Sequence, residues 1–322
     1  MDTALHIGEP WMWAAFVGFV LAMLAVDLFL VGGNKAHKVG FREAAAWSVV
    51  WVSLAMLFNA GLWWYLKGTY GGEVADAKAV EFLTGYLIEK ALAVDNIFVF
   101  LMIFGFFAVP AEVQRRVLVY GVFGAIAMRA VMIVAGAWLV QEFHWILYLF
   151  GAFLVVTGVK MLMFAEAAPD LARNPLLNWI KRHVPLTPDY RGEKFCVREN
   201  GVRVFTPLLL VLVMIELSDL IFAVDSIPAI FAITTDPFIV FTSNIFAILG
   251  LRAMYFMLAG MADRFHLLKY GLAMVLVFVG TKMLIVDFYK IPVGLSLGIV
   301  ALVIATFMFA SLWTTRKKEA SL

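Results

Sequence analysis

Two short stretches of nearly the same sequence, residues 89–96 and 219–226, each place two carboxylates inside sequence apolar enough to span a bilayer. In both stretches the two carboxylates are six residues apart. The four acids are Glu89, Asp95, Asp219 and Asp225. Charged side chains are costly within a membrane, so acids in such positions mark a functional site by default. We therefore expect the chemistry of the protein to centre on these two stretches.

Oxygen atoms dominate the side chains that could bind a ligand in the apolar stretches. All-oxygen surroundings suit hard divalent cations such as Mg²⁺, Ca²⁺ and Mn²⁺. The histidines lie in or beside predicted connections, and a single cysteine builds neither a cysteine metal cage nor an internal disulfide. The sequence thus predicts a divalent-cation site, with further oxygen donors at Asn59, Ser218 and Asn244. The predicted metal ligands are Asp27, Glu89, Asp95, Asn96, Glu216, Asp219, Asp225 and Ser226.

Basic residues offer these acids an alternative partner. Those within or at the ends of the apolar stretches are Lys90, Arg129, Lys160, Arg252 and Lys282. Some pairing is expected, and we assign Arg129 and Arg252 to orienting carboxylates rather than to binding a cation. Pairing alone explains six acids poorly, because single buried ion pairs seldom add net stability.

The six-residue spacing fits a regular helix poorly. Residues seven apart, such as Glu89 and Asn96, share a helix face, whereas residues six apart diverge by about a third of a turn. On an unbroken helix Glu216 points away from Asp225, so either these acids face different neighbours or the helix unwinds locally. Pro228 follows the second stretch and removes a hydrogen-bond donor, so we expect the helix to unwind there and expose a carbonyl to a cation. The first stretch lacks a proline and gives less reason to expect a break.

The composition is that of a polytopic membrane protein. The chain has 322 residues, of which 64% are hydrophobic and 15% charged, against about 45–50% and about 25% in ordinary soluble domains. The formal net charge of +2 gives no reason to expect nucleic acid as a partner. We predict an all-α transmembrane helix bundle of about nine spans. The predicted spans are Trp11–Val31, Ala45–Leu66, Val80–Phe107, Val117–Val140, Trp145–Phe164, Phe205–Ile233, Phe238–Ala259, Leu267–Asp287 and Ile291–Trp313.

Positive charges alternate between the predicted connections. Lysine and arginine gather in the first, third, fifth and seventh connections and at the C-terminus, whereas the other connections are short, acidic or near neutral. By the positive-inside rule, the N-terminus is periplasmic and the C-terminus cytoplasmic. The first ten residues contain no lysine or arginine, so we interpret the first apolar run as a retained helix rather than a signal peptide. The long fifth connection, residues 165–204, is interpreted as a cytoplasmic loop between two halves.

Three consecutive spans, in residues 80–164, resemble another three, in residues 205–288. The matching segments are residues 93–95 with 223–225, 128–130 with 251–253, and 158–162 with 280–284. The charge rule orients the two units oppositely, as in transporters with inverted repeats, whose substrate sites lie at the repeat interface. Chance likeness is the rival interpretation, but the matches include Asp, Arg and Lys in the same order. The remaining parts are a two-helix segment, residues 1–79, and a last helix with its tail, residues 289–322.

The longest motifs resemble those of a known family. Glu-Lys-x-Leu-Ala-Val-Asp-Asn at residues 89–96, together with residues 216–229 and 243–255, is similar to the TerC family of integral membrane proteins and, within it, to the Alx branch. The resemblance implies a role in manganese homeostasis, through export of Mn²⁺ across the bacterial inner membrane. It also implies an association with the alkaline-pH response and with tellurium resistance. The family's acidic positions carry over to Asp27, Glu89, Asp95, Glu216, Asp219 and Asp225.

We therefore expect a secondary transporter and not an enzyme. Rocking of one repeat against the other would alternate access, and carboxylates that bind either metal or protons would couple the two ions. The expected partners are a divalent metal ion, protons and the lipid bilayer, with no cofactor. No Walker loop or catalytic triad occurs in the sequence, which argues against an ATP-driven pump. The alternative is a non-transporting scaffold or insertion-assisting protein in a metal or tellurium stress-response complex.

Overall fold

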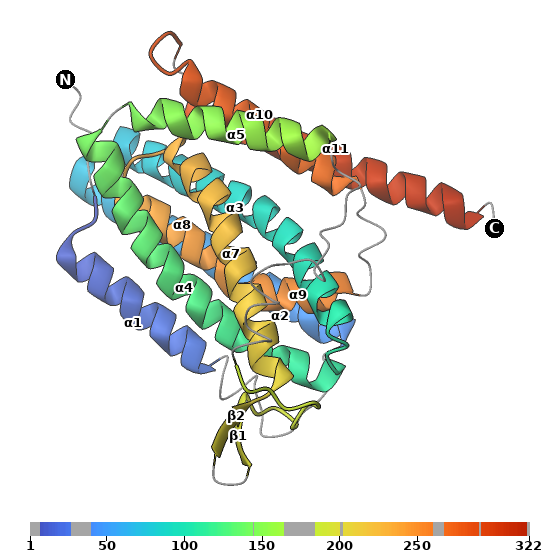
Figure 1. The fold of residues 1–322 in the computed structure, drawn as a ribbon. Helices are drawn as coiled ribbons and strands as arrows, with labels where there is room; N and C mark the ends of the chain where they lie inside the picture. The colour runs from blue at the N-terminus through green and yellow to red at the C-terminus, as the bar shows by residue number, and fades with distance from the viewer. Residues whose placement is uncertain are drawn as a thin grey trace.

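Ten helices and one two-stranded hairpin form the part of the chain that the computed structural model describes (Figure 1). The described residues are 7–26, 40–143, 145–163, 184–199, 202–259, 267–289 and 291–320. The helices are α1 (Pro10–Val26), α2 (Phe41–Tyr70), α3 (Gly72–Phe106), α4 (Ala111–Glu142), α5 (Ile146–Met163), α7 (Pro207–Phe231), α8 (Pro237–Leu249), α9 (Leu251–Ala259), α10 (Leu268–Leu284) and α11 (Val293–Ala320). The strands are β1 (Cys196–Glu199) and β2 (Val202–Phe205).

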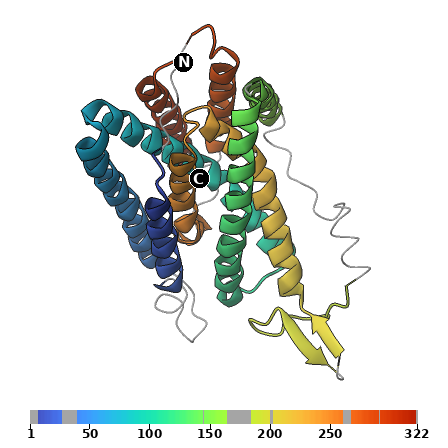
Figure 2. The same cartoon turned by 90° about the vertical axis from the view of Figure 1, so that its left-hand side faces the viewer.

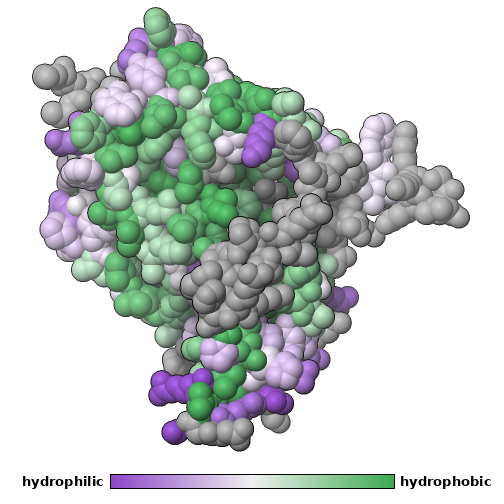
Figure 3. All heavy atoms as spheres, viewed as in Figure 1, coloured by the Kyte–Doolittle hydropathy of each residue, from purple (hydrophilic) through white to green (hydrophobic). Residues whose placement is uncertain are grey.

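Apolar sequence explains the helical architecture, because a segment in lipid must satisfy all its backbone hydrogen bonds internally. Six helical segments are long and apolar enough to cross a membrane: α2, α4, α5, α7, the α8–α9 pair and α11. Helix α1 is a shorter apolar helix. The chain is thus a polytopic helical membrane protein with six to seven candidate spans, and its visible helical surface is largely hydrophobic (Figure 3). Each of the nine predicted spans nevertheless coincides with a helix, the other two being α3 and α10.

Helix α3 begins earlier than the apolar run predicts. It starts at Gly72, because α2 ends at Tyr70 and Gly71 alone separates the two helices, with a φ of 93° that glycine readily adopts. The indole nitrogen of Trp63 donates to Asp76 Oδ1 at 2.7 Å and so joins the two helices across this turn. Hydropathy finds only the apolar part of such a helix, and therefore places its start several residues late.

A β-hairpin in the fifth connection departs from the predicted all-α fold. Strands β1 and β2 pair antiparallel, with Cys196 opposite Phe205, and the hairpin projects from one end of the bundle (Figure 2). The sequence Asn200-Gly201 separates the strands, and Asn-Gly is a strong hairpin signal. The hydroxyl of Tyr190, just before the hairpin, donates to the carbonyl of Phe107 at 2.7 Å. The described part of the fifth connection, around Tyr190, therefore packs against the connection between α3 and α4.

The helices around α8 form the centre of the bundle. Every residue of α8 from Phe238 to Leu249 is buried, and α3 packs against α2, α7 and α8, while α4 packs against α7 and α8. Helices α5 and α10 pack side by side along their length (Figure 1). This arrangement brings both acidic stretches, on α3 and α7, next to α4 and α8.

The predicted unwinding at Pro228 is wrong. Helix α7 is continuous through Pro228 and ends at Phe231, and a proline inside a membrane helix is tolerated where neighbouring groups satisfy the freed carbonyl. The break occurs instead at Gly250, between α8 and α9. The ammonium of Lys90 donates to the carbonyl of Ala247 at 3.0 Å, and a Cβ on Gly250 would lie 2.5 Å from Lys90 Nζ. Gly250 leaves room for the Lys90 side chain, and Lys90 satisfies the carbonyl of Ala247 near the end of α8. Both residues therefore contribute to the helix break.

Candidate functional site

The guanidinium of Arg129, on α4, lies between carboxylates of the two acidic stretches. Its side chain is 1% exposed. Nη1 donates to Oε1 of Glu89 on α3. Nη2 donates to Oδ1 of Asp219 on α7 at 2.9 Å, and Nε donates to Oδ2 of the same carboxylate at 3.3 Å. Arg129 therefore joins the first acid of one stretch to the first acid of the other.

Neutral polar side chains complete the hydrogen bonding around this ion pair. Asn244, on α8, donates from Nδ2 to Oε2 of Glu89 at 3.1 Å and accepts from Arg129 Nη1 at 3.2 Å. Asn96 donates to Oδ1 of Asp219 at 3.2 Å. The hydroxyl of Ser226 accepts from Arg129 Nη1 at 3.4 Å. Four helices, α3, α4, α7 and α8, thus contribute to one buried polar cluster, which we call the Arg129 cluster (Arg129, Glu89, Asp219, Asn96, Ser226 and Asn244).

Burial makes the charges of this cluster interdependent. Two carboxylates and one guanidinium carry a formal net charge of −1 within the described members of the cluster. Breaking a buried pair by removing one partner costs about 3–5 kcal/mol, because the other charge is left uncompensated. Any change in the position of Arg129 therefore has to be accompanied by another positive charge or by protonation.

The structure brings together four of the eight predicted ligands: Glu89, Asn96, Asp219 and Ser226. Asp27 lies outside the described residues. The side chains of Asp95 and Asp225 also lie outside the description, although their backbones belong to α3 and α7. Among the described residues, no group of three or more His, Cys, Asp or Glu side chains is arranged to hold a metal ion. The metal site remains a prediction.

Glu216 lies one turn before Asp219 and faces α4. A Cβ on Gly124 would collide with its carboxylate, so the carboxylate lies directly against the α4 backbone. Within the described part of the chain, its Oε2 is buried without a hydrogen-bond partner. Glu216 is therefore adjacent to the Arg129 cluster without joining its hydrogen bonds.

The two arginines differ in their placement. The predicted role of Arg129 in orienting carboxylates is confirmed by its bonds to Glu89 and Asp219. Arg252 is buried and, with Asp219, lines a small cavity of about 10 Å³ among apolar side chains. Such a volume holds about one water molecule, so this cavity has no room for a hydrated ion.

Two features of the structure lie outside the predicted site. Asn244 is predicted as an oxygen donor but is not among the predicted ligands. A second buried polar cluster involves α3, where Lys78 Nζ lies 2.9 Å from Oε2 of Glu81 and 3.4 Å from Oδ2 of Asp236. The hydroxyl of Thr234 donates to Oε2 of Glu81 at 2.6 Å. These residues lie at or beyond predicted span ends, where charged side chains are common and do not by themselves indicate a site.

The chain is similar along most of its length to known membrane proteins. The model of the "Integral membrane protein TerC family" matches residues 74–319. A protein of Photorhabdus laumondii and one of Escherichia coli (strain K12), both named "Putative membrane-bound redox modulator Alx", are each 57% identical over 97% of this chain and 98% of their own. An "Uncharacterized membrane protein STKORF319" of Myxococcus xanthus is 50% identical over 100% of this chain and 98% of its own. No solved structure matches.

These matches cover nearly the whole chain and include both acidic stretches, α4 and α8. The resemblance read from the motifs is thereby confirmed. The chain belongs to the TerC family of integral membrane proteins and is a close homologue of Alx.

Proposed function

We propose that the protein is a secondary transporter that exports divalent cations, with Mn²⁺ as the substrate, across the bacterial inner membrane in exchange for protons. The observation that carries the proposal is the position of Arg129 between Glu89 and Asp219, one acid from each stretch. A positively charged group already occupies the space between the two carboxylates. A divalent cation that binds there takes the place of a tethered monovalent one.

Charge supports this exchange. With Arg129 in place the two carboxylates and the guanidinium sum to −1. A divalent cation in place of the guanidinium brings the two carboxylates to zero, and the displaced guanidinium then requires another partner. The amide and hydroxyl oxygens of Asn96, Ser226 and Asn244 supply the hard neutral ligands that such a cation prefers. We propose that the transporter alternates between an arginine-bound and a metal-bound state. Protonation of the carboxylates competes with the metal ion and couples its movement to protons.

Helix packing supports the inverted repeat on which alternating access depends. The C-terminal part of α3 packs against the N-terminal part of α7, so the two motif helices run antiparallel. Helices that correspond in the two repeats also pack together: α3 with α7, α4 with α8 and α9, and α5 with α10. A pseudo-two-fold axis between the repeats would produce this pairing of each helix with its counterpart.

A close contact between α5 and α10 supports the same relation. A Cβ on Gly158 would lie 2.8 Å from the carbonyl oxygen of Ala273, and a Cβ on Gly280 would lie 2.7 Å from that of Gly151. The sequence match aligns Gly158 with Gly280, and the same offset aligns Gly151 with Ala273. The two contacts are therefore one contact repeated with the helices exchanged. We infer nine spans, with α3 and α10 crossing the membrane and a periplasmic N-terminus.

Metal uptake into vesicles tests the proposal. The protein is reconstituted into liposomes that contain a Mn²⁺-quenched dye, and uptake is followed with a pH gradient imposed or collapsed. We expect Glu89→Gln and Asp219→Asn to abolish uptake, and Glu112→Gln, in the exposed first turn of α4, to leave it unchanged. Asp95→Asn and Asp225→Asn extend the test to the other two motif acids. Unchanged uptake in Glu89→Gln and Asp219→Asn would overturn the proposed site.

Two of the relatives are named redox modulators. The cysteine content of this chain limits which redox chemistry it could perform. It contains one cysteine, Cys196, which is exposed on β1. A thiol–disulfide cycle within one chain requires two cysteines. We therefore expect Cys196→Ser to transport Mn²⁺ at the unaltered rate, with or without a reductant. A loss of transport in Cys196→Ser would favour a redox role over the proposed one.

A further inference from the structure

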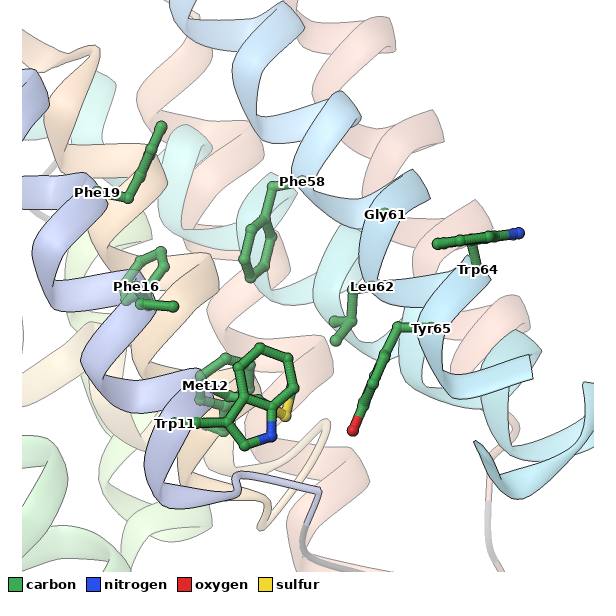
Figure 4. Close-up of a pocket in the computed structure, with 11 residues that line it drawn as sticks. Trp11, Met12, Phe16, Phe19, Phe58, Gly61, Leu62, Trp64 and Tyr65 are labelled. Carbon is green, nitrogen blue, oxygen red and sulfur yellow. The ribbon is translucent and has the colours of Figure 1, made fainter. Parts of the chain in front are cut away.

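A slot lies between α1 and the C-terminal half of α2, with a volume of about 490 Å³. This volume is within the range of about 300–1,000 Å³ that is typical of ligand pockets. Figure 4 shows side chains of both helices on the two sides of the slot. Met12, Phe16 and Phe19 line it from α1, and Phe58, Leu62 and Tyr65 line it from α2.

The lining of the slot is apolar except at one end. There the indole nitrogen of Trp11 donates to Oε2 of Glu9 at 2.8 Å, and the rings of Trp11 and Tyr65 meet edge to face with centroids 5.4 Å apart. Tryptophan and tyrosine with polar atoms turned outward are typical of the membrane–water interface. The polar end of the slot therefore lies at headgroup level, and the remainder lies in the hydrocarbon region.

The length of the slot matches one leaflet. Its lining runs along α1 from Trp11 to Phe19, which is about 12 Å at 1.5 Å per residue. Half of a hydrocarbon core about 30 Å thick is about 15 Å. The floor is built by packed rings, since Phe16 lies 5.5 Å from Phe58 and 6.2 Å from Phe238 between ring centroids. The slot is thus preformed, and it runs in the direction of a lipid chain.

We propose that this slot binds one acyl chain of a bilayer phospholipid. Both of its walls continue into lipid-facing surface, with exposed Val17 and Leu21 on α1 and Leu57 on α2. A hydrocarbon chain can enter from this surface without crossing a polar barrier. An empty apolar slot forfeits dispersion contacts, and water in it would gain few hydrogen bonds. An acyl chain removes both penalties and holds α1 to α2.

Photocrosslinking tests this site independently of metal transport. The protein is reconstituted in vesicles of phosphatidylethanolamine and phosphatidylglycerol, with a small fraction of phosphatidylcholine that carries a diazirine in the middle of one acyl chain. After irradiation, adducts are located by peptide mass spectrometry. We expect adducts to concentrate on Met12, Phe16 and Phe19 relative to Val131 and Val134, which are exposed on α4 outside the slot.

A filled slot provides the matched comparison. Gly61 lines the slot, and a Cβ added there meets no atom within 4 Å. Gly61→Phe is expected to lower the slot adducts several-fold while the α4 adducts persist. Gly68→Phe, at a position of α2 that is equally open but outside the slot, is expected to change neither. If Gly61→Phe elutes as a misfolded protein, Ala15→Leu on the opposite wall provides the same test.

Two results would overturn the inference. Equal labelling of slot and α4 residues would mean that only the general lipid annulus is sampled. Absence of lipid adducts on the slot residues, with the α4 adducts retained, would mean that lipid does not enter the slot and that another occupant, such as a second copy of the chain, fills it.

Discussion

Arg129 of α4 binds Asp219 of α7 through two parallel hydrogen bonds, from Nη2 to Oδ1 at 2.9 Å and from Nε to Oδ2 at 3.3 Å. This fork-to-fork geometry fixes the guanidinium plane as well as its distance from the carboxylate. The remaining guanidinium nitrogen, Nη1, then faces Glu89 on the opposite side. The relative position of α4 and α7 therefore determines how the acid on α3 is neutralised.

The first prediction concerns the charge of Arg129. Arg129→Gln leaves Glu89 and Asp219 buried without their cation, and we expect a loss of about 3–5 kcal/mol in the free energy of unfolding. The triple variant Arg129→Gln, Glu89→Gln, Asp219→Asn carries no buried charge at these positions and should recover most of that loss. Thermal unfolding in detergent measures both. Equal destabilisation of the single and triple variants would contradict the electrostatic explanation.

The second prediction concerns Asn244, which contacts both Glu89 and Arg129. Asn244→Leu leaves Oε2 of Glu89 without this donor, at a cost of about 1–3 kcal/mol, and should lower Mn²⁺ uptake. Ser243→Ala is the matched control, because the Ser243 hydroxyl donates to backbone carbonyls of its own helix. If both variants lower uptake to the same extent, the effect belongs to α8 packing and not to Asn244.

The third prediction concerns Asp236, which caps α8 by accepting from the backbone N–H of Phe238 at 3.0 Å. Asp236 also accepts from the N–H of Ile7 at 3.0 Å and lies 3.4 Å from Lys78 Nζ. Loss of an N-cap alone costs about 0.5–2 kcal/mol, so Asp236→Ala should lower stability by at least that amount. Glu73→Gln, exposed in the first turn of α3, should not. Unfolding midpoints distinguish the two variants. An unchanged midpoint in Asp236→Ala would contradict a stabilising role of Asp236 as the N-cap of α8.

The fourth prediction concerns the contact between α5 and α10. A methyl group on Gly158 would lie 2.8 Å from the carbonyl oxygen of Ala273, and one on Gly280 would lie 2.7 Å from that of Gly151. Overpacking of this kind costs about 1–3 kcal/mol, and Gly158→Ala and Gly280→Ala should destabilise to similar extents if the repeats are related by symmetry. Gly294→Ala, on α11 in open space, should be neutral. Thermal unfolding of the three variants is the measurement. A Gly158→Ala variant as stable as the parent protein would argue against the symmetry between the repeats.

The fifth prediction concerns Tyr190, whose hydroxyl donates to the carbonyl of Phe107. Burial raises the pKa of Tyr190 above its ordinary value, so the folded state favours the neutral phenol. The stabilising contact is complete at neutral pH and is lost as the pH rises through that raised pKa. Cleavage of residues 184–206 by subtilisin should therefore increase at strongly alkaline pH. Tyr190→Phe should be cleaved faster at neutral pH and respond less to alkali, whereas an unchanged pH response would contradict the role of Tyr190.

The sequence predicts those features that depend on local composition. Apolar runs of about 20 residues locate all nine helical segments, because a bilayer leaves few other conformations for them. Charges in apolar sequence single out Glu89, Asp219 and Arg129, because their burial requires a partner. The family follows from long motifs and is confirmed by the near-full-length relatives.

Features that depend on packing between distant segments escape such analysis. The bidentate bond from Arg129 to Asp219 spans 90 residues of sequence and depends on how α4 meets α7. The local sequence predicts a helix break at Pro228, but α7 continues through this residue. The break lies at Gly250, where Lys90 approaches from another helix. The sequence Asn200-Gly201 is typical of a hairpin turn, but it lies in a charged connection that resembles an irregular loop.

Helix α8 is buried at every residue from Phe238 to Leu249, and this has a consequence for how the chain assembles. Its final surroundings exist only after α2, α3 and α4 have gathered around it. Asn244 gains its partners Glu89 and Arg129 only at that stage. Insertion of this segment into the bilayer and completion of the fold are therefore separate events, and the polar centre forms in the second.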